Sequence, residues 1–90
     1  MKAALEAAFP AVSWQWNNET GGLYGRNRRT WLYVRIHGAG YAAVAEMEFR
    51  GEGWAETPEE AVRLACADLG AKWRDYAERV VDALGKWGQP

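Results

Sequence analysis

Residues 30–37 read TWLYVRIH and form the clearest strand pattern in the chain. Two sets of side chains alternate along it, an aliphatic set of Leu32, Val34 and Ile36 and a second set of Trp31, Tyr33, Arg35 and His37. Because successive side chains of a strand point to opposite faces, we expect the aliphatic set to face the core. The second set then projects from the other face. A helix covers that face, or an aromatic and arginine-rich surface lies open.

The segments on either side of this strand predict two more strands. Gly38-Ala39-Gly40 is a short glycine-containing connection, and residues 41–50 alternate again, which predicts a hairpin. The sequence Gly51-Glu52-Gly53 is interpreted as the turn that ends the returning strand. Upstream, residues 12–17 alternate apolar and polar and predict a strand. Residues 17–29 carry three glycines and predict a loop.

Helices are predicted at both ends of the chain. Residues 2–9 are rich in helix formers and are followed by Pro10. Thr57, Pro58 and Glu60 form a strong helix start, with Thr57 as the cap. A stripe of apolar residues at intervals of three or four follows, formed by Ala61, Ala65, Leu69, Trp73, Tyr76, Val80, Leu84 and Trp87. We expect one long helix that bends at Gly70.

The predicted fold is therefore a single α+β domain over residues 1–90, in the order αβββα with a three-stranded antiparallel sheet. The length of 90 residues fits one domain, and no stretch approaches the roughly 18 apolar residues of a membrane span. The N-terminus lacks the hydrophobic segment of a signal peptide. One cysteine excludes an internal disulfide, and one Cys with one His argues against a zinc site.

The net charge of -1 is an average over two unlike halves. Residues 1–45 hold five basic and two acidic residues, whereas residues 46–90 hold six basic and ten acidic residues. The basic half peaks at Arg26, Arg28 and Arg29, which form either a solvated loop or a contact site for an anionic partner. The acidic half opens with a candidate negative patch of Glu46, Glu48, Glu52, Glu56, Glu59 and Glu60, for which a solvated face is the simpler interpretation.

No combination of residues predicts catalysis. Cys66 lies between two alanines of the predicted helix with no histidine nearby in sequence, and it is interpreted as a buried structural residue. His37 is expected to be solvated at a hairpin end. Glu46 and Glu48 share one predicted strand face, where solvation explains them more simply than acid–base chemistry. We expect no enzyme, no cofactor and no metal.

Five features follow one another over residues 30–73: the strand at 31–36, the glycine turn, an alanine-rich returning strand, the cap at Ala55-Glu56-Thr57-Pro58 and the helix segment AVRLACADL at 61–69. In this combination they resemble the phage ABA sandwich domain. The resemblance covers about half of the chain and implies a phage or prophage source and a helix-covered sheet. The strand–cap–helix segment also resembles HicB-like antitoxins, more weakly. Small anti-CRISPR proteins are similar in size and residue balance alone.

These observations favour a non-enzymatic protein that binds a host protein or ribonucleoprotein complex in the bacterial cytoplasm, most concretely as an anti-CRISPR-type inhibitor. Trp, Tyr and Arg are enriched in binding hot spots. The candidate contact residues are Arg26, Arg28, Arg29, Trp31, Tyr33, Arg35 and Trp54, with Glu46, Glu48, Glu52 and Glu56 as the acidic patch. The alternative is a nucleic-acid-binding module or antitoxin, in which Trp14, Trp16, Trp31 and Tyr33 stack on bases beside Arg35.

Overall fold

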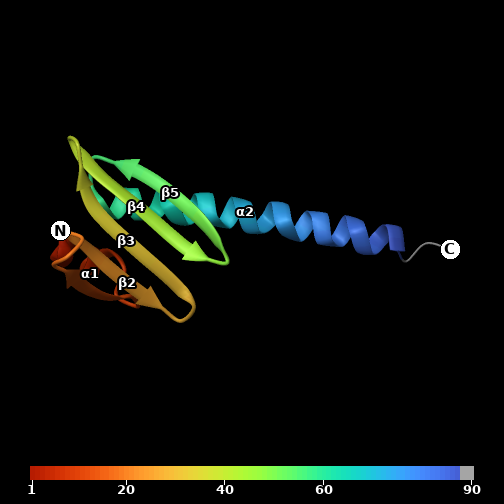
Figure 1. The fold of residues 1–90 in the computed structure, drawn as a ribbon, viewed down its shortest axis with the longest axis horizontal. Coiled ribbons are helices and arrows are strands. Elements are labelled where there is room, and N and C mark those ends of the chain that lie inside the picture. The colour runs from red at the N-terminus through yellow and green to blue at the C-terminus, as the bar shows by residue number, and fades with distance from the viewer. Residues whose placement is uncertain (88–90) are drawn as a thin grey trace.

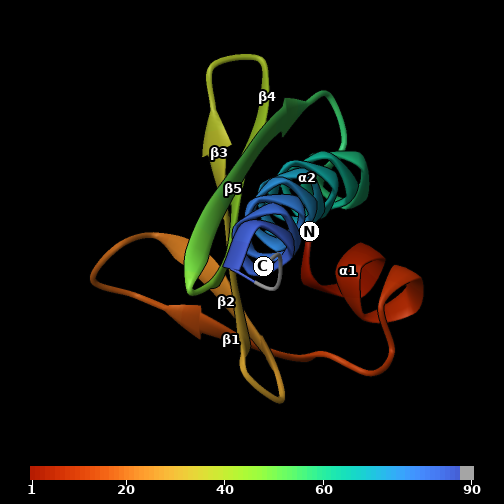
Figure 2. The same cartoon turned by 90° about the vertical axis from the view of Figure 1, so that its right-hand side faces the viewer.

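The fold is one antiparallel sheet with both helices on the same side of it (Figures 1 and 2). The structure is a computed structural model that describes the backbone of residues 1–87 and the side chains of residues 1–85. Its elements are α1 (Lys2–Ala8), β1 (Ser13–Asn17), β2 (Gly22–Asn27), β3 (Thr30–His37), β4 (Gly40–Met47), β5 (Phe49–Ala55) and α2 (Pro58–Trp87). The strands follow one another across the sheet in chain order, so every pair is a hairpin.

The predicted α+β class and both helices are confirmed, but the predicted three-stranded sheet is wrong because the sheet has five strands. The segment 17–29, interpreted as a loop, contains β2. The single strand predicted over residues 41–50 is two strands that meet at a turn on Glu48, whose φ of 63° is left-handed. The predicted turn Gly51-Glu52-Gly53 lies inside β5.

The core lies between the sheet and the helices. Leu32 and Val34 of β3 face it as predicted, with Leu23 of β2, whereas Ile36 at the end of the strand is exposed. From α2 it receives Ala61, Val62, Ala65 and Leu69. Leu5 of α1 is fully buried and joins the same core, which explains how a helix of only 7 residues is held in place.

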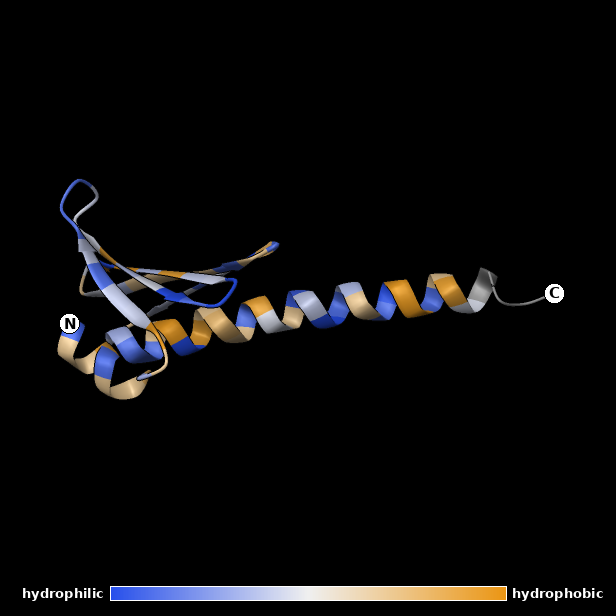
Figure 3. Cartoon of the chain, turned by 90° about the horizontal axis from the view of Figure 1, so that it is seen from below, coloured by the Kyte–Doolittle hydropathy of each residue, from blue (hydrophilic) through white to orange (hydrophobic). Residues whose placement is uncertain are grey.

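Helix α2 begins where the sequence predicts and runs as one helix through Gly70. The backbone N–H of Glu60 donates to the hydroxyl oxygen of Thr57 at 3.4 Å, so Thr57 is the cap. Figure 1 shows the axis of α2 without a sharp bend, contrary to the bend expected at Gly70. Only the first part of α2 lies against the sheet, and the rest extends past it (Figure 3).

Two glycines of β5 allow α2 to lie very close to the sheet. A Cβ at Gly51 would lie 2.2 Å from the carbonyl oxygen of Ala65, and one at Gly53 would lie 2.6 Å from the carbonyl oxygen of Ala61. Both contacts are with helix backbone, which no side-chain rotation can move aside. The glycines are therefore required by close approach of strand and helix.

Asp68 ties α2 to β5 through its carboxylate. The backbone N–H of Glu52 donates to Asp68 Oδ2 at 2.9 Å, and Lys72 Nζ lies 3.2 Å from the same oxygen. The hydrogen bond from Glu52, followed by the interactions with Lys72, holds the pKa of Asp68 below its ordinary value of 3.8. The charged carboxylate is therefore favoured by folding.

We expect this contribution to be present at neutral pH and to be lost as the pH falls through the lowered pKa of Asp68. Asp68→Asn should lower the urea midpoint at pH 7, and its difference from the unsubstituted protein should shrink at about pH 3. The control is Asp75→Asn, which removes an exposed i,i+4 pair with Arg79 alone. An Asp68→Asn difference that is equal at both pH values would contradict the assignment.

Candidate functional site

The face of the sheet that points away from the helices is uncovered and carries most of the predicted contact residues (Figure 2). Strand register sets this placement. Arg26 pairs with Trp31, and Trp31 pairs in turn with Glu46, so these three side chains share one face. Arg35 pairs with Ala42, which pairs with Trp54 on the same face. The structure thus brings Arg26, Trp31, Tyr33, Arg35 and Trp54 together on what is called here the open face.

The register also corrects the predicted stacking surface of Trp14, Trp16, Trp31 and Tyr33. Trp14 pairs with Gly25, which pairs with Leu32, so Trp14 lies on the helix-covered face. It is buried, and its ring centroid lies 6.4 Å from that of Phe9. Trp16 pairs with the buried Leu23 and therefore shares that face. Only Trp31 and Tyr33 of the four belong to the open face.

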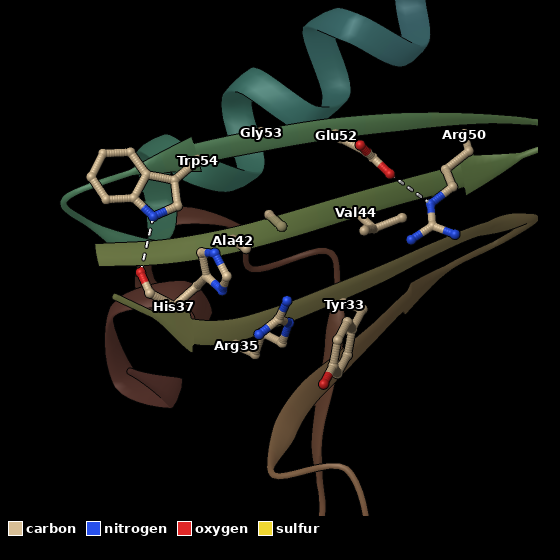
Figure 4. A pocket seen from close by; sticks show the side chains of 10 residues that line it. Tyr33, Arg35, His37, Ala42, Val44, Arg50, Glu52, Gly53 and Trp54 are labelled. Atoms are coloured by element: carbon tan, nitrogen blue, oxygen red, sulfur yellow. Dashed lines mark hydrogen bonds and ion pairs between the residues drawn. The ribbon is translucent and has the colours of Figure 1, made fainter. Parts of the chain in front are cut away.

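A groove of about 680 Å³ runs along β4 on the open face (Figure 4). Its floor is formed by the short side chains of Ala42 and Val44. One wall comes from β3 with Tyr33, Arg35 and His37, and the other comes from β5 with Arg50, Glu52 and Trp54. The groove exists because small residues of β4 lie between larger residues of β3 and β5. A second, smaller hollow beside it is lined by Tyr24, Trp31, Tyr33, Val44 and Glu46.

Trp54 closes one end of the groove and is fixed in place. Its Nε1 donates to the backbone carbonyl oxygen of His37 at 3.0 Å, which ties β5 to the end of β3 (Figure 4). The ring lies on Gly40, where a Cβ would come within 2.6 Å of it. The indole remains 47% exposed, so it presents an ordered apolar surface to solvent.

The aromatic residues at the other end of the groove are also ordered. The rings of Tyr24 and Tyr33 lie 4.7 Å apart between centroids, and Tyr33 packs over Gly22. The guanidinium of Arg26 lies 4.8 Å from the ring centroid of Trp31. Trp31 is nevertheless 51% exposed. Ordered, half-exposed aromatic rings lose little side-chain entropy when a partner covers them.

The charges of the open face are unevenly paired. Arg50 Nε lies 3.1 Å from Glu52 Oε1, so this pair is neutral overall. Arg35 has no ion pair or hydrogen bond within the part of the chain that the structure describes, and it points into the groove (Figure 4). Arg28 and Arg29 lie at the exposed turn between β2 and β3. The open face and its adjoining turn therefore offer cations to an anionic group.

The predicted acidic patch is divided by the fold. Glu46 and Glu52 belong to the open face, near Arg50 and the groove. Glu48 occupies the turn between β4 and β5, and Glu56 follows the opposite end of β5. These four acidic residues, close in sequence, are therefore spread from one end of the β4–β5 hairpin to the other. Glu59 and Glu60 of the larger predicted set lie in the first turn of α2.

Chemical groups suited to catalysis or metal binding do not gather on this face. Among the described residues, no cluster of three or more His, Cys, Asp or Glu side chains is placed to hold a metal ion. Cys66 is exposed on α2, contrary to its expected burial, although partial desolvation still raises the pKa of its thiol. The described helices contain no apolar stretch sufficient to cross a membrane.

Sequence reasoning missed Tyr24, His37 and Arg50 as members of the site. Tyr24 was missed because β2 was interpreted as a glycine-rich loop. Arg50 was placed at the end of the strand predicted over residues 41–50 and was not singled out, because the reversal at Glu48 that brings it back beside β4 was not predicted. A signal was available in β2, since Gly22 and Gly25 flank Leu23 and Tyr24, and a glycine inside a strand indicates close approach of another group. Comparisons with family models, curated proteins and solved structures find no match to this chain.

Proposed function

We propose that this protein is a non-enzymatic binding module that engages another protein through the open face. One observation carries the proposal: no helix of the described chain covers the second face of the sheet, which displays Trp31, Tyr33 and Trp54 around Arg35, a cation without an ion pair among the described residues. These residue types supply most of the energy of protein interfaces. Small residues on β4 add a groove into which a partner's side chains would fit.

The charges of the open face favour a partner with an acidic surface. Arg35 and the arginines of the β2–β3 turn offer unpaired positive charge, while Glu46 and Glu52 give the face a mixed character. Mixed charge beside aromatic rings is typical of protein recognition. A phage-encoded inhibitor of a bacterial defence complex, of anti-CRISPR type, is the most concrete form of this binding in the bacterial cytoplasm. The resemblance of residues 30–73 to the phage ABA sandwich domain supports only the phage source, because the uncovered open face departs from the helix-covered sheet which that resemblance implies.

Binding of single-stranded nucleic acid is the second candidate, favoured by the ordered Tyr24–Tyr33 pair next to Trp31. Bases stack on such rings with little sequence preference. A phosphate backbone carries negative charge alone and would meet Glu46 and Glu52 on this face, whereas a protein surface can match mixed charge with its own cations and anions, which is why protein binding comes first.

The test compares two variants that each replace one arginine with glutamate and therefore change the net charge equally. Trp31→Ala combined with Arg35→Glu alters the open face, whereas Arg74→Glu alters an exposed position of α2 beyond the sheet. The unsubstituted chain is used to capture a partner protein from nuclease-treated bacterial lysate. We expect Arg74→Glu to capture the same protein equally well. Its affinity for the open-face variant should fall at least about 30-fold, the effect of losing one hot-spot residue.

Circular dichroism establishes that both variants are folded before capture. Equal capture by all three proteins would remove the open face from the proposal. Binding of labelled 20-nucleotide single strands at about 150 mM salt, lost in the open-face variant, would favour the second candidate instead.

A further inference from the structure

The C-terminal part of α2 stands free of the domain. Every described side chain from Arg74 to Gly85 is exposed, and Figures 1 and 3 show this part of the helix extending past the sheet. The ring of Tyr76 still lies 5.4 Å from that of Phe49 of β5 between centroids.

This free segment is apolar along one side. The stripe that packs on the sheet at Leu69 and Trp73 continues through Tyr76, Val80 and Leu84 on the same side of the helix. Tyr76 is 50% exposed and Leu84 is 62% exposed, with Val81 beside them. Most helical stability in proteins comes from packing of an amphipathic face, so cover on this apolar side would stabilise the segment.

We propose that the cover is the same segment of a second copy, paired antiparallel with Val80 at the two-fold axis. The stripe is symmetric about Val80: Ala77 and Ala83 lie three residues on either side, and Tyr76 and Leu84 lie four residues on either side. A two-fold interface must be complementary to itself, and this spacing sets each tyrosine against a leucine and each alanine against an alanine.

The shape and charge of the segment fit such a pair. Ala77 and Ala83 are small, so two helices can approach closely where they cross. The charged residue nearest the stripe, Arg79, is 3.0 Å from Asp75 within its own helix, so pairing would not bring two bare guanidinium groups together. The opposite side of the helix carries Glu78 and Arg74, which remain in water.

The area available sets the strength of the association. Two helices in contact from Tyr76 to Leu84 meet over about 12 Å, because Trp73 before this stretch packs on the sheet. The area buried by the two copies together is then below the roughly 1,200 Å² of standard interfaces, in the range of weak and transient associations. We therefore expect a reversible dimer that dissociates at micromolar concentrations. The pairing does not depend on the open face, which lies on the other side of the sheet.

The first test is sedimentation equilibrium from about 5 to 500 µM. The unsubstituted protein should show a monomer–dimer equilibrium, and Val80→Glu, which places two carboxylates at the axis, should raise the dissociation constant at least about tenfold. Ala71→Glu is the matched control because it adds the same charge on the opposite side of α2, and it should change the constant less than twofold. A monomer throughout the range would overturn the proposal.

The second test locates the axis and the orientation by cysteine pairing in a Cys66→Ala background. Val80→Cys should form a disulfide-linked dimer under mild oxidation. Tyr76→Cys and Leu84→Cys should cross-link with each other when mixed, and neither should cross-link with itself. Self-linking at position 76 would overturn the antiparallel arrangement. Absence of a dimer together with capture of a foreign helical protein would assign the stripe to a different partner.

Discussion

Replacing Gly51 with alanine is expected to destabilise the protein by about 3 kcal/mol, whereas the same replacement at Gly70 is expected to stabilise it by about 0.5–1 kcal/mol. The two glycines differ in their surroundings. A Cβ at Gly51 would lie 2.2 Å from the carbonyl oxygen of Ala65 and 2.5 Å from the backbone nitrogen of Leu69. A Cβ at Gly70 meets nothing within 4 Å.

The loss at Gly51 arises because the clash is with backbone on the far side of the interface. Strand β5 and helix α2 would have to separate, and the packing of Ala61, Ala65 and Leu69 on the sheet would loosen with them. The gain at Gly70 arises because alanine restricts the unfolded chain and suits the middle of a helix. Domains of this size have a free energy of unfolding of about 5–13 kcal/mol, so the Gly51 variant should remain measurable.

Urea unfolding followed by circular dichroism at 222 nm measures both changes. A Gly51→Ala protein as stable as the unsubstituted one would show that β5 and α2 are farther apart than described here. A destabilised Gly70→Ala protein would show that the helix departs from regular geometry at that point.

Glycines inside β2 and β5 explain why the sequence analysis missed these two strands. Glycine in a sequence indicates a turn when its freedom of φ is needed, but in β2 and β5 it is needed for space. Trp14 occupies the position that a Cβ at Gly25 would take, and Tyr33 does the same at Gly22. The sequence alone does not show whether a glycine provides a turn conformation or space for a neighbouring side chain or helix, because the neighbouring group is unknown until the fold is known. Both missed strands therefore have the same physical cause.

The turn on Glu48 was missed for a different reason. Met47 and Phe49 pair with each other across it, so the alternation that puts Ala43, Ala45 and Met47 on the helix side continues unbroken into β5. A periodicity that passes through a reversal gives no sign of it. Glu48 adopts a left-handed φ without the glycine or asparagine that usually signals one.

Half of the candidate site was predictable. The alternation within residues 30–37 is enough to separate Trp31, Tyr33 and Arg35 from the core-facing Leu32 and Val34. Whether that face is covered depends on which side of the sheet both helices occupy, and every local pattern is compatible with either answer. The groove depends on β4 having small residues between two taller strands, which requires knowledge of strand order.

Alanine substitutions on the two faces of the sheet are expected to have very different effects on the free energy of unfolding. Leu23→Ala is expected to cost about 3–4 kcal/mol, because Leu23 is fully buried and its loss leaves a cavity between Val34 and Trp16 of the neighbouring strands. Trp31→Ala removes a much larger side chain, yet it is expected to cost only about 1 kcal/mol. Trp31 is half exposed, and its interaction with Arg26 is a surface one.

Thermal and urea unfolding of the two single variants provide the measurement, with Leu23→Val as a smaller change at the core position. Equal losses of unfolding free energy at both positions would mean that the indole of Trp31 stabilises the fold as much as the buried side chain of Leu23 does. The expected inequality has a functional consequence. A large apolar ring that contributes little to folding leaves its exposed half available to a partner, and the free energy of covering that half adds to binding. A loss of partner binding in Trp31→Ala, with a stability loss of only about 1 kcal/mol, is therefore the result that the open face, as a binding surface, requires.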